Sequence, residues 1–292
     1  MVTRRQLMIG AGAGLLGSAM RVQAAEGWAG ALERDFARIE TAAKARLGIA
    51  VLDTETGGSA FHRGDERFPM CSTFKVVAAG AVLARVDRGE EQLARRIRFA
   101  AKDVVPYSPA TKEHAGGDGM TLAALCEAAL TLSDNTAGNM MLSALGGPAG
   151  VTAYARILGD AVTRLDRTET SLNDAVPGDP RDTTSPRAMA ANLQRLLLGD
   201  ALSPASREQL TAWMLACRTG DARIRAGAPA ASRVADKTGS GDYGTANDVA
   251  VIWPPGRKPL IVAVYLTESE AGLDPRSATI AEVARAVTAA LG

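Results

Sequence analysis

Ser72 and Lys75 are the first residues in the chain whose types and spacing could do chemistry. On a helix, residues three positions apart lie on one face, so the lysine amine would be within reach of the serine hydroxyl. A serine hydroxyl becomes a nucleophile near neutral pH when a neighbouring base takes its proton. A serine and a lysine at this spacing occur by chance about once in a chain of this length. The pair alone therefore also fits a helix-capping serine followed by a solvated lysine.

Three segments further along the chain favour the chemical interpretation. Ser-Asp-Asn stands at 133–135 after an apolar run, and Lys-Thr-Gly stands at 237–239 in an extended segment. Each tripeptide is expected by chance at about one position in several thousand, so both in this order indicate one shared site. Between them, Arg-Thr-Glu-Thr-Ser-Leu-Asn at 167–173 places an asparagine four residues after a glutamate.

Together these motifs resemble those of the class A serine β-lactamases, and the likeness covers nearly all of the chain after residue 25. The 167–173 segment resembles the class A Ω-loop, which supplies a deacylating glutamate. The resemblance implies hydrolysis of the β-lactam amide of penicillins and cephalosporins, and hence β-lactam resistance. It implies no metal and no organic cofactor, small-molecule β-lactams as partners, and a monomer.

The resemblance also implies catalytic roles. Ser72 would attack the β-lactam carbonyl, and its proton would pass to Lys75, or to Glu169 through a water; the two alternatives stay open. Ser133 would relay a proton to the departing ring nitrogen. Glu169, with the nearby amide of Asn173, would then hold and deprotonate the water that hydrolyses the serine ester.

A second set of residues would bind the substrate, again by resemblance. Lys237, Thr238 and Ser240 would meet the substrate carboxylate, where charge-assisted hydrogen bonds are strong. Asn135 would hold the side-chain amide of the substrate, and Tyr107 would form part of the cleft wall.

Three further features of the family concern an arginine of the site and the Ω-loop. Either Arg223 or Arg276 would help to bind the carboxylate, and the choice stays open. Arg167 and Asp182 would pair across the neck of the Ω-loop. Family members often have a proline after the loop glutamate, joined by a cis peptide bond. This chain has Thr170 there, and we expect the bond to be cis nevertheless.

The overall composition excludes other classes of protein. The 292 residues carry a net charge of +1, with 47% hydrophobic and 22% charged residues, which is ordinary for a globular protein. A net charge near zero argues against nucleic acid or an anionic membrane as the partner. The two histidines, His62 and His114, are far apart without metal-type spacing, which argues against a zinc hydrolase.

Three cysteines leave at least one thiol unpaired within the chain. Cys126 and Cys217 are each expected on the apolar stripe of a helix as small core residues. Cys71 directly precedes the candidate nucleophile. Some carbapenem-hydrolysing relatives bridge this cysteine to one at the position of Gly241, and the glycine here excludes that bridge.

The first 25 residues have the features of an export signal. Arg4 and Arg5 precede a weakly apolar run from Leu7 to Met20, and small residues around Ala24 suit cleavage. The run is too short to cross a bilayer. The sequence therefore predicts a twin-arginine signal peptide and a periplasmic protein without a stable membrane anchor.

Hydrophobic periodicity predicts an α+β fold. We expect helices near 32–43 and 280–291, strands at 47–53, 59–63, 234–240, 248–253 and 260–267, and helices through most of 72–217. Short turns favour antiparallel pairing, which gives a five-stranded antiparallel sheet flanked by helices, plus an inserted all-α domain. The predicted units are a discontinuous α/β domain at 26–66 and 218–292 and an all-α domain at 67–217, with the site in the cleft between them.

Three other functions stay open at this point. A penicillin-binding D,D-peptidase shares the nucleophile and the cleft, but the segment around Glu169 argues against it. A catalytically silent binding module would have lost a catalytic residue, and none is lost. An esterase with the serine–lysine pair would not require Asn135 or a carboxylate site at 237–239.

Overall fold

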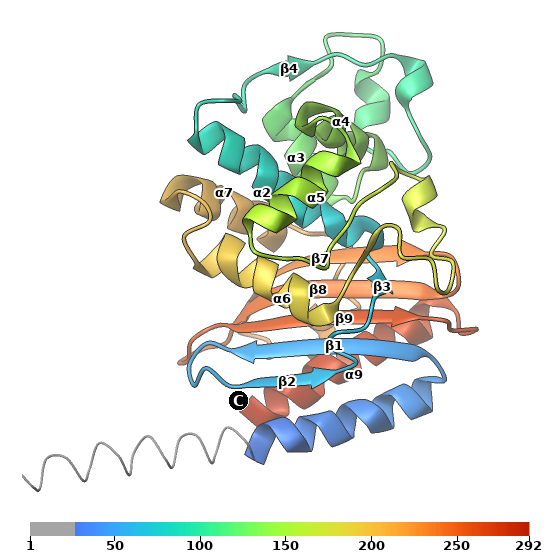
Figure 1. Ribbon diagram of the computed structural model, residues 1–292, viewed down its shortest axis with the longest axis vertical. Helices are drawn as coiled ribbons and strands as arrows, with labels where there is room; N and C mark the ends of the chain where they lie inside the picture. The colour runs from blue at the N-terminus through green and yellow to red at the C-terminus, as the bar shows by residue number, and fades with distance from the viewer. Residues whose placement is uncertain (1–26, 292) are drawn as a thin grey trace, which may run out of the picture.

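The centre of the molecule is a five-stranded antiparallel sheet with the strand order β2-β1-β9-β8-β7 (Figure 1). The computed structural model describes residues 27–291, so the predicted signal peptide at 1–25 lies outside the described residues. The strands are β1 (Arg46–Asp53), β2 (Ser59–His62), β7 (Arg233–Gly241), β8 (Thr245–Trp253) and β9 (Leu260–Thr267). The predicted α+β class and antiparallel sheet are confirmed.

The sheet is covered on both faces, and strand β9 shows why its sequence is apolar throughout. Successive side chains of a strand point to opposite faces. In β9, Ile261, Ala263 and Tyr265 enter one hydrophobic core, whereas Val262 and Val264 enter the other. A strand buried on both faces has no polar alternation, which explains the uninterrupted apolar run.

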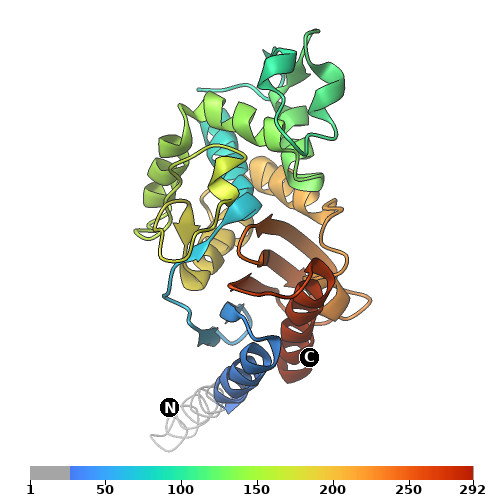
Figure 2. The same cartoon turned by 90° about the vertical axis from the view of Figure 1, so that its right-hand side faces the viewer.

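Helices from the middle of the chain cover one face of the sheet, and the terminal helices cover the other (Figures 1 and 2). The first helix, residues 27–43, packs beside α9 (Leu273–Leu291). Within the described part of the chain, none of the helices is long and apolar enough to cross a membrane. The middle helices are α2 (Phe74–Asp87), α3 (Leu122–Thr131), α4 (Asn135–Leu145), α5 (Pro148–Ile157), α6 (Pro186–Leu193) and α7 (Pro204–Leu215). The short α8 (Ile224–Gly227) packs beside α9 on the other face.

Short strands add two small pairings among these helices: β3 (Phe68–Pro69) pairs with β6 (Thr183–Thr184), and β4 (Arg96–Ile97) pairs with β5 (Met120–Thr121). The segment from β3 leads directly to a 3-10 turn at Cys71–Thr73, which runs into α2. Ser72 therefore lies on this turn, just before the helix that was predicted to begin with it.

Cys217 was predicted to lie on the apolar stripe of a helix, and this is wrong. Helix α7 ends at Leu215, because the chain leaves it through a tighter turn in which the Cys217 N–H donates to Met214 O over 3.2 Å. The next N–H, of Arg218, donates to Thr131 O at the end of α3. Cys217 is nevertheless buried, at 3% exposure. Cys126 lies on α3, buried as predicted.

Gly48 on β1 generates a prediction about stability. A Cβ at this position would lie 2.6 Å from Phe68 Cζ and 2.8 Å from Pro186 Cγ, so Gly48→Ala would overpack the contact between sheet and helices. We expect a loss of about 1–3 kcal/mol in the free energy of unfolding, measured by urea denaturation. Gly30→Ala in the first helix is the matched control and should stabilise or leave stability unchanged, because its nearest atom is 3.7 Å away. Equal stability of Gly48→Ala and wild type would contradict the packing argument.

Candidate active site

Ser72, Lys75 and Glu169 lie together in a buried cluster where the helices meet the sheet. Lys75 Nζ donates to Ser72 Oγ over 2.9 Å and lies 2.8 Å from Glu169 Oε1. Ser72 Oγ is also 3.3 Å from that carboxylate oxygen. The exposed fractions of the three residues are 7%, 0% and 4%. Two candidate bases therefore lie close enough to one hydroxyl to take its proton.

The amine of Lys75 has more acceptors than its ammonium form has protons. Besides Ser72 and Glu169, Nζ reaches the Ser133 carbonyl oxygen at 2.9 Å and Asn135 Oδ1 at 2.8 Å. An ammonium has three N–H groups, so these four oxygens share them. Burial lowers the pKa of Lys75, and the Glu169 carboxylate opposes that shift. The arrangement suits movement of a proton between hydroxyl, amine and carboxylate.

The 133–135 tripeptide reaches the site because of its middle residue. Asp134 caps helix α4, with Oδ1 accepting the Ala137 N–H over 2.8 Å. Its Oδ2 accepts the N–H groups of Ala110 and Thr111, both over 2.9 Å. This buried carboxylate ties the loop that carries Tyr107 to the start of α4. The residues at 133 and 135 are thereby fixed beside the nucleophile.

Asn139, which the sequence analysis missed, holds the backbone of Glu169 on both sides. Its Oδ1 accepts the Glu169 N–H over 2.8 Å, and its Nδ2 donates to Glu169 O over 2.9 Å. Asn139 follows Asn135 by four residues on α4, and this spacing on one helix face is the signal that could have found it. The peptide bond between Glu169 and Thr170 is cis, as expected.

The carboxylate of Glu169 is held by Asn173, whose Nδ2 donates to Glu169 Oε2 over 2.6 Å. The other amide atom, Asn173 Oδ1, is buried and accepts no hydrogen bond from the protein. This oxygen is therefore available to accept one from a water or a substrate group.

Gly138, which precedes Asn139 on α4, leaves room for the side chain of Lys75. A Cβ at this position would lie 2.8 Å from Lys75 Cε and 3.7 Å from Glu169 Cγ. The close approach of α4 to the buried Lys75 side chain therefore requires a residue without a side chain.

Arg167 and Asp182 close the neck of the segment from 167 to 182, called the Ω-loop below. Arg167 Nε lies 2.6 Å from Asp182 Oδ2, which is the ion pair that the resemblance implied. Asp182 Oδ1 also accepts the backbone N–H groups of Asp166 and Arg167, and Asp182 O accepts the Met70 N–H over 2.9 Å. Because Met70 precedes Ser72 by two residues, one aspartate fixes both the Ω-loop and the nucleophile.

Lys237 extends from strand β7 toward Ser133. Its Nζ donates to Ser133 Oγ over 3.0 Å and to Thr238 O over 2.8 Å. Burial lowers the pKa of Lys237 to about 8, and the positive charge of Lys75 adds to this shift. Thr219, also missed by the sequence analysis, has its Oγ1 2.6 Å from Thr238 Oγ1. The ammonium of Lys237 and the hydroxyl of Thr238 are thus each held in place.

The geometry favours Arg223 over Arg276 as the arginine of the site. Arg223 is 5% exposed, and its Nη2 donates to Ser240 Oγ over 2.8 Å. Its Nη1 donates to the carbonyl oxygens of Gly239 and Asn247. Arg276 donates to two backbone carbonyl groups and is not among the residues that line the cleft.

A cleft of about 380 Å³ joins these groups. Tyr107 lines the cleft, and 62% of its surface is exposed. Leu273, at the start of α9, also lines the cleft, and no motif in the sequence indicated it. Three charged residues of the site are buried and do not line the cleft themselves: Lys75, Glu169 and Lys237. The lining residues are Ser72, Tyr107, Ser133, Asn135, Asn173, Thr219, Arg223, Thr238, Gly239, Ser240 and Leu273.

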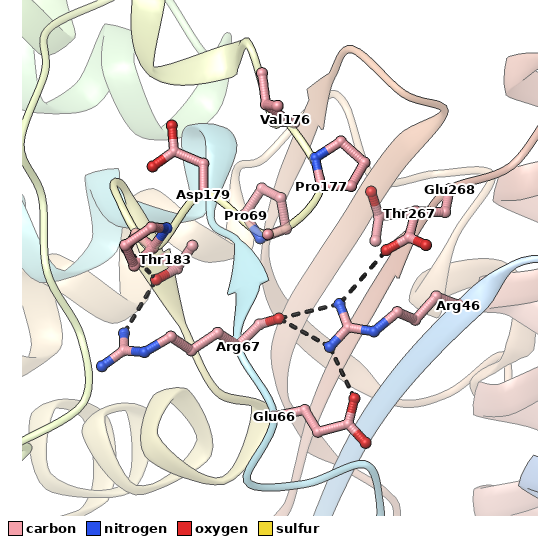
Figure 3. Close-up of a pocket in the computed structure, with 13 residues that line it drawn as sticks. Arg46, Glu66, Arg67, Pro69, Val176, Pro177, Asp179, Thr183, Thr267 and Glu268 are labelled. Carbon is pink, nitrogen blue, oxygen red and sulfur yellow. Dashed lines mark hydrogen bonds and ion pairs between the residues drawn. The ribbon is translucent and has the colours of Figure 1, made fainter.

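A second cavity, of about 540 Å³, lies between residues 175–180 of the Ω-loop and the sheet (Figure 3). Arg46 lines this cavity and forms an ion pair with Glu66 over 2.8 Å. Its threonine hydroxyls are engaged, since Thr183 Oγ1 donates to Pro180 O and Thr267 Oγ1 pairs with a neighbouring threonine. The lining offers no hydroxyl paired with a base, so the chemistry belongs to the cleft that contains Ser72.

The three cysteines are free, buried thiols. Burial raises the pKa of Cys126 to about 12 and that of Cys217 to about 11, and it also raises the pKa of Cys71. Protonated thiols are poor nucleophiles, so these residues do not compete with Ser72. Among residues 27–291, no three His, Cys, Asp or Glu side chains gather in a group that could hold a metal ion.

Comparison with known proteins gives concordant results. Residues 31–291 match the family described as "Beta-lactamase enzyme family". β-Lactamase AST-1 of Nocardia asteroides is 52% identical over 257 residues, covering 88% of this chain and 83% of that protein. β-Lactamase CTX-M-8 of Citrobacter amalonaticus is 49% identical over 257 residues, covering 88% of each chain.

Solved structures show the same likeness. The class A β-lactamase of the last common ancestor of Gram-negative bacteria is 63% identical, with a TM-score of 0.88, and the match covers 90% of this chain and all of that one. The putative class A β-lactamase PenP from Rhodopseudomonas palustris is 60% identical with a TM-score of 0.88, over 89% of this chain and 99% of that one.

Proposed function

The chain belongs to the β-lactamase enzyme family and is a class A serine β-lactamase, and on this premise we propose that Ser72 forms the acyl-enzyme and Glu169 activates the water that releases it. Membership of this family sets aside the D,D-peptidase, the binding module and the esterase as alternatives. The enzyme hydrolyses β-lactams and confers resistance to them. The roles of individual residues are our proposal.

Acylation begins when Ser72 Oγ attacks the β-lactam carbonyl carbon. The proton leaves to Lys75 at 2.9 Å, once that amine has passed a proton to the Glu169 carboxylate at 2.8 Å, or it leaves to Glu169 through a water. Backbone N–H groups of Ser72 and Ser240 would stabilise the oxyanion. Removal of one such donor lowers the rate by about two to three orders of magnitude. Ser133, held by Lys237 over 3.0 Å, then passes a proton to the ring nitrogen as the amide bond breaks.

Substrate binding uses the opposite wall of the cleft. The hydroxyls of Thr238 and Ser240 meet the substrate carboxylate, and the buried ammonium of Lys237 attracts the carboxylate from behind them. Arg223 supports Ser240 over 2.8 Å. Asn135 holds the substrate's side-chain amide. These groups fit penicillins and cephalosporins, since both classes carry a carboxylate beside the ring that the enzyme opens.

Deacylation rests on one observation, the inward orientation of Glu169. Its carboxyl is buried, lies 3.3 Å from Ser72 Oγ and accepts a hydrogen bond from Asn173. A water bound beside the Ser72 ester would donate one proton to the Glu169 carboxylate and the other to the unpartnered Asn173 Oδ1. Deprotonation of this water generates the hydroxide that hydrolyses the ester.

Glu169→Ala tests this proposal. Ser72 and Lys75 remain, so we expect acylation to continue while deacylation slows by about two to four orders of magnitude, the usual contribution of a general base. Intact-protein mass spectrometry after mixing with a penicillin should show the mass of a trapped adduct. Glu268→Ala in the second cavity is the matched control and should turn over without an accumulated adduct. Wild-type steady-state turnover by Glu169→Ala would rule out the role.

The lowered pKa of Lys237 predicts an alkaline limit to substrate binding. As pH rises through about 8, the ammonium loses its proton and its attraction for the substrate carboxylate, so KM should rise and kcat/KM should fall. In K237R the guanidinium stays charged at these pH values, so the alkaline limb should move to higher pH. The measurement is the pH profile of kcat/KM for the wild type and for K237R. An unchanged alkaline limb in K237R would show that another group titrates there.

The strands also bear on how the chain divides into domains. All strands of the main sheet come from residues 46–62 and 233–267, which supports a discontinuous α/β domain at 26–66 and 218–292 with an all-α domain at 67–217. We propose a monomer, which light scattering of the purified protein can test.

We also propose that the precursor is exported to the periplasm by the twin-arginine route and cleaved near residue 25. The support is the sequence alone, namely the Arg4-Arg5 pair before an apolar run. Changing both arginines to lysine should leave uncleaved precursor inside the cell, measured by fractionation and immunoblotting. The same protein behind a general secretory signal is the control for folding. Undiminished export of the lysine variant would exclude this route.

A further inference from the structure

Two buried aspartates lie beside the site without a part in the mechanism above. Asp236 on β7 and Asp248 on β8 are each 0% exposed. The strand register pairs Asp236 with Ala250 and Thr238 with Asp248. The two aspartates are therefore diagonal neighbours, and since they are an even number of positions apart in register, their side chains point to the same face of the sheet.

Each carboxyl group has one satisfied oxygen and one unpartnered oxygen. Asp236 Oδ1 accepts Arg225 Nε over 2.6 Å, and Asp248 Oδ2 accepts the Ile224 N–H over 3.0 Å. Asp236 Oδ2 and Asp248 Oδ1 are buried without any hydrogen-bond partner in the protein. A Cβ at Gly220 would lie 2.7 Å from Asp236 Cγ, so backbone packs directly against this carboxyl. Leaving two buried acceptors unsatisfied is costly.

The electrostatic environment distinguishes the two groups. Asp236 is in contact with a guanidinium, which stabilises its charged form. Asp248 receives a neutral N–H, and burial together with the charge of Asp236 raises its pKa well above the usual range, while the charge of Arg223 opposes this shift. Burial also raises the pKa of Asp236, but the Arg225 charge opposes the shift. A proton is therefore held more favourably on Asp248 than on Asp236.

We propose that Asp236 and Asp248 share one proton, which Asp248 Oδ1 carries and donates to Asp236 Oδ2. This single hydrogen bond satisfies both unpartnered oxygens at once. It leaves the pair with one negative charge, which the Arg225 guanidinium balances at 2.6 Å. No proton leaves the pair during catalysis, so its effect is on the position of its neighbours.

The neighbours that the pair positions are residues 223–225. Asp236 fixes Arg225 and Asp248 fixes the Ile224 N–H, so consecutive residues of this segment are held by the two aspartates. The preceding residue, Arg223, is thereby directed toward Ser240. Asp236 and Asp248 are positioning residues for the carboxylate wall of the cleft; this consequence rests on the proposed role of Arg223, whereas the shared proton does not.

Infrared spectroscopy tests the shared proton without reference to activity. The wild-type protein at pH 7 should show the C=O stretching band of one buried protonated carboxyl group, and the band should be absent from both D248N and D236N. Absence of the band from the wild type, or its persistence in D248N, would overturn the proposal. Because the measurement needs no substrate, it is independent of the roles assigned to Ser72 and Glu169.

Kinetics of two variants at one position test the positioning effect. In D248N the amide can donate to Asp236 Oδ2 and accept the Ile224 N–H, as a protonated aspartate does, whereas D248A leaves both groups unpartnered. We expect kcat/KM for a penicillin to be at least about tenfold higher in D248N than in D248A, the scale of one buried unsatisfied group, with most of the loss in KM. Equal kcat/KM of the two variants would refute the positioning role while leaving the infrared result to decide the shared proton.

Discussion

The burial of the Lys75 ammonium against the Glu169 carboxylate is the constraint that the rest of the site satisfies. Taking two charges out of water costs several kcal/mol for each ion, roughly, and direct contact compensates only when further hydrogen bonds satisfy both groups. Ser133 and Asn135 supply acceptors to the amine, and Asn173 supplies a donor to the carboxylate. The start of α4, the Ω-loop and the 3-10 turn must therefore all be in place together.

The architecture provides this placement by setting a covered sheet against a layer of helices. Both faces of the sheet are packed, so β7 is held firmly at the edge of the sheet. An exposed edge strand carries backbone groups that invite pairing with another chain. Here the edge strand β7 forms one wall of the substrate cleft, through Thr238, Gly239 and Ser240. Asp182 joins the arrangement from the other side, since it fixes the Ω-loop and also accepts the N–H of Met70.

The sequence predicted those parts of the fold and site in which spacing along the chain determines position in space. The strands and the motif residues are of this kind, and β9 occupies its predicted bounds. Asn139 was missed because an amide that holds another segment's backbone looks, in sequence, like a solvated one. The choice between Arg223 and Arg276 depended on how a loop packs over β7 and β8, which no periodicity encodes. Cys217 was misplaced because a tertiary hydrogen bond from Arg218 follows the end of α7.

Gly138 sets a limit on how far this enzyme can be made more robust. Glycine within a helix costs about 0.5–1 kcal/mol relative to alanine, so its replacement would be an obvious choice for anyone engineering thermostability. The Cε methylene of Lys75 occupies the space that a methyl group would need. Helix α4 thus retains an intrinsically weak turn as a condition of turnover, and selection for heat resistance has to find its gains in other parts of the molecule.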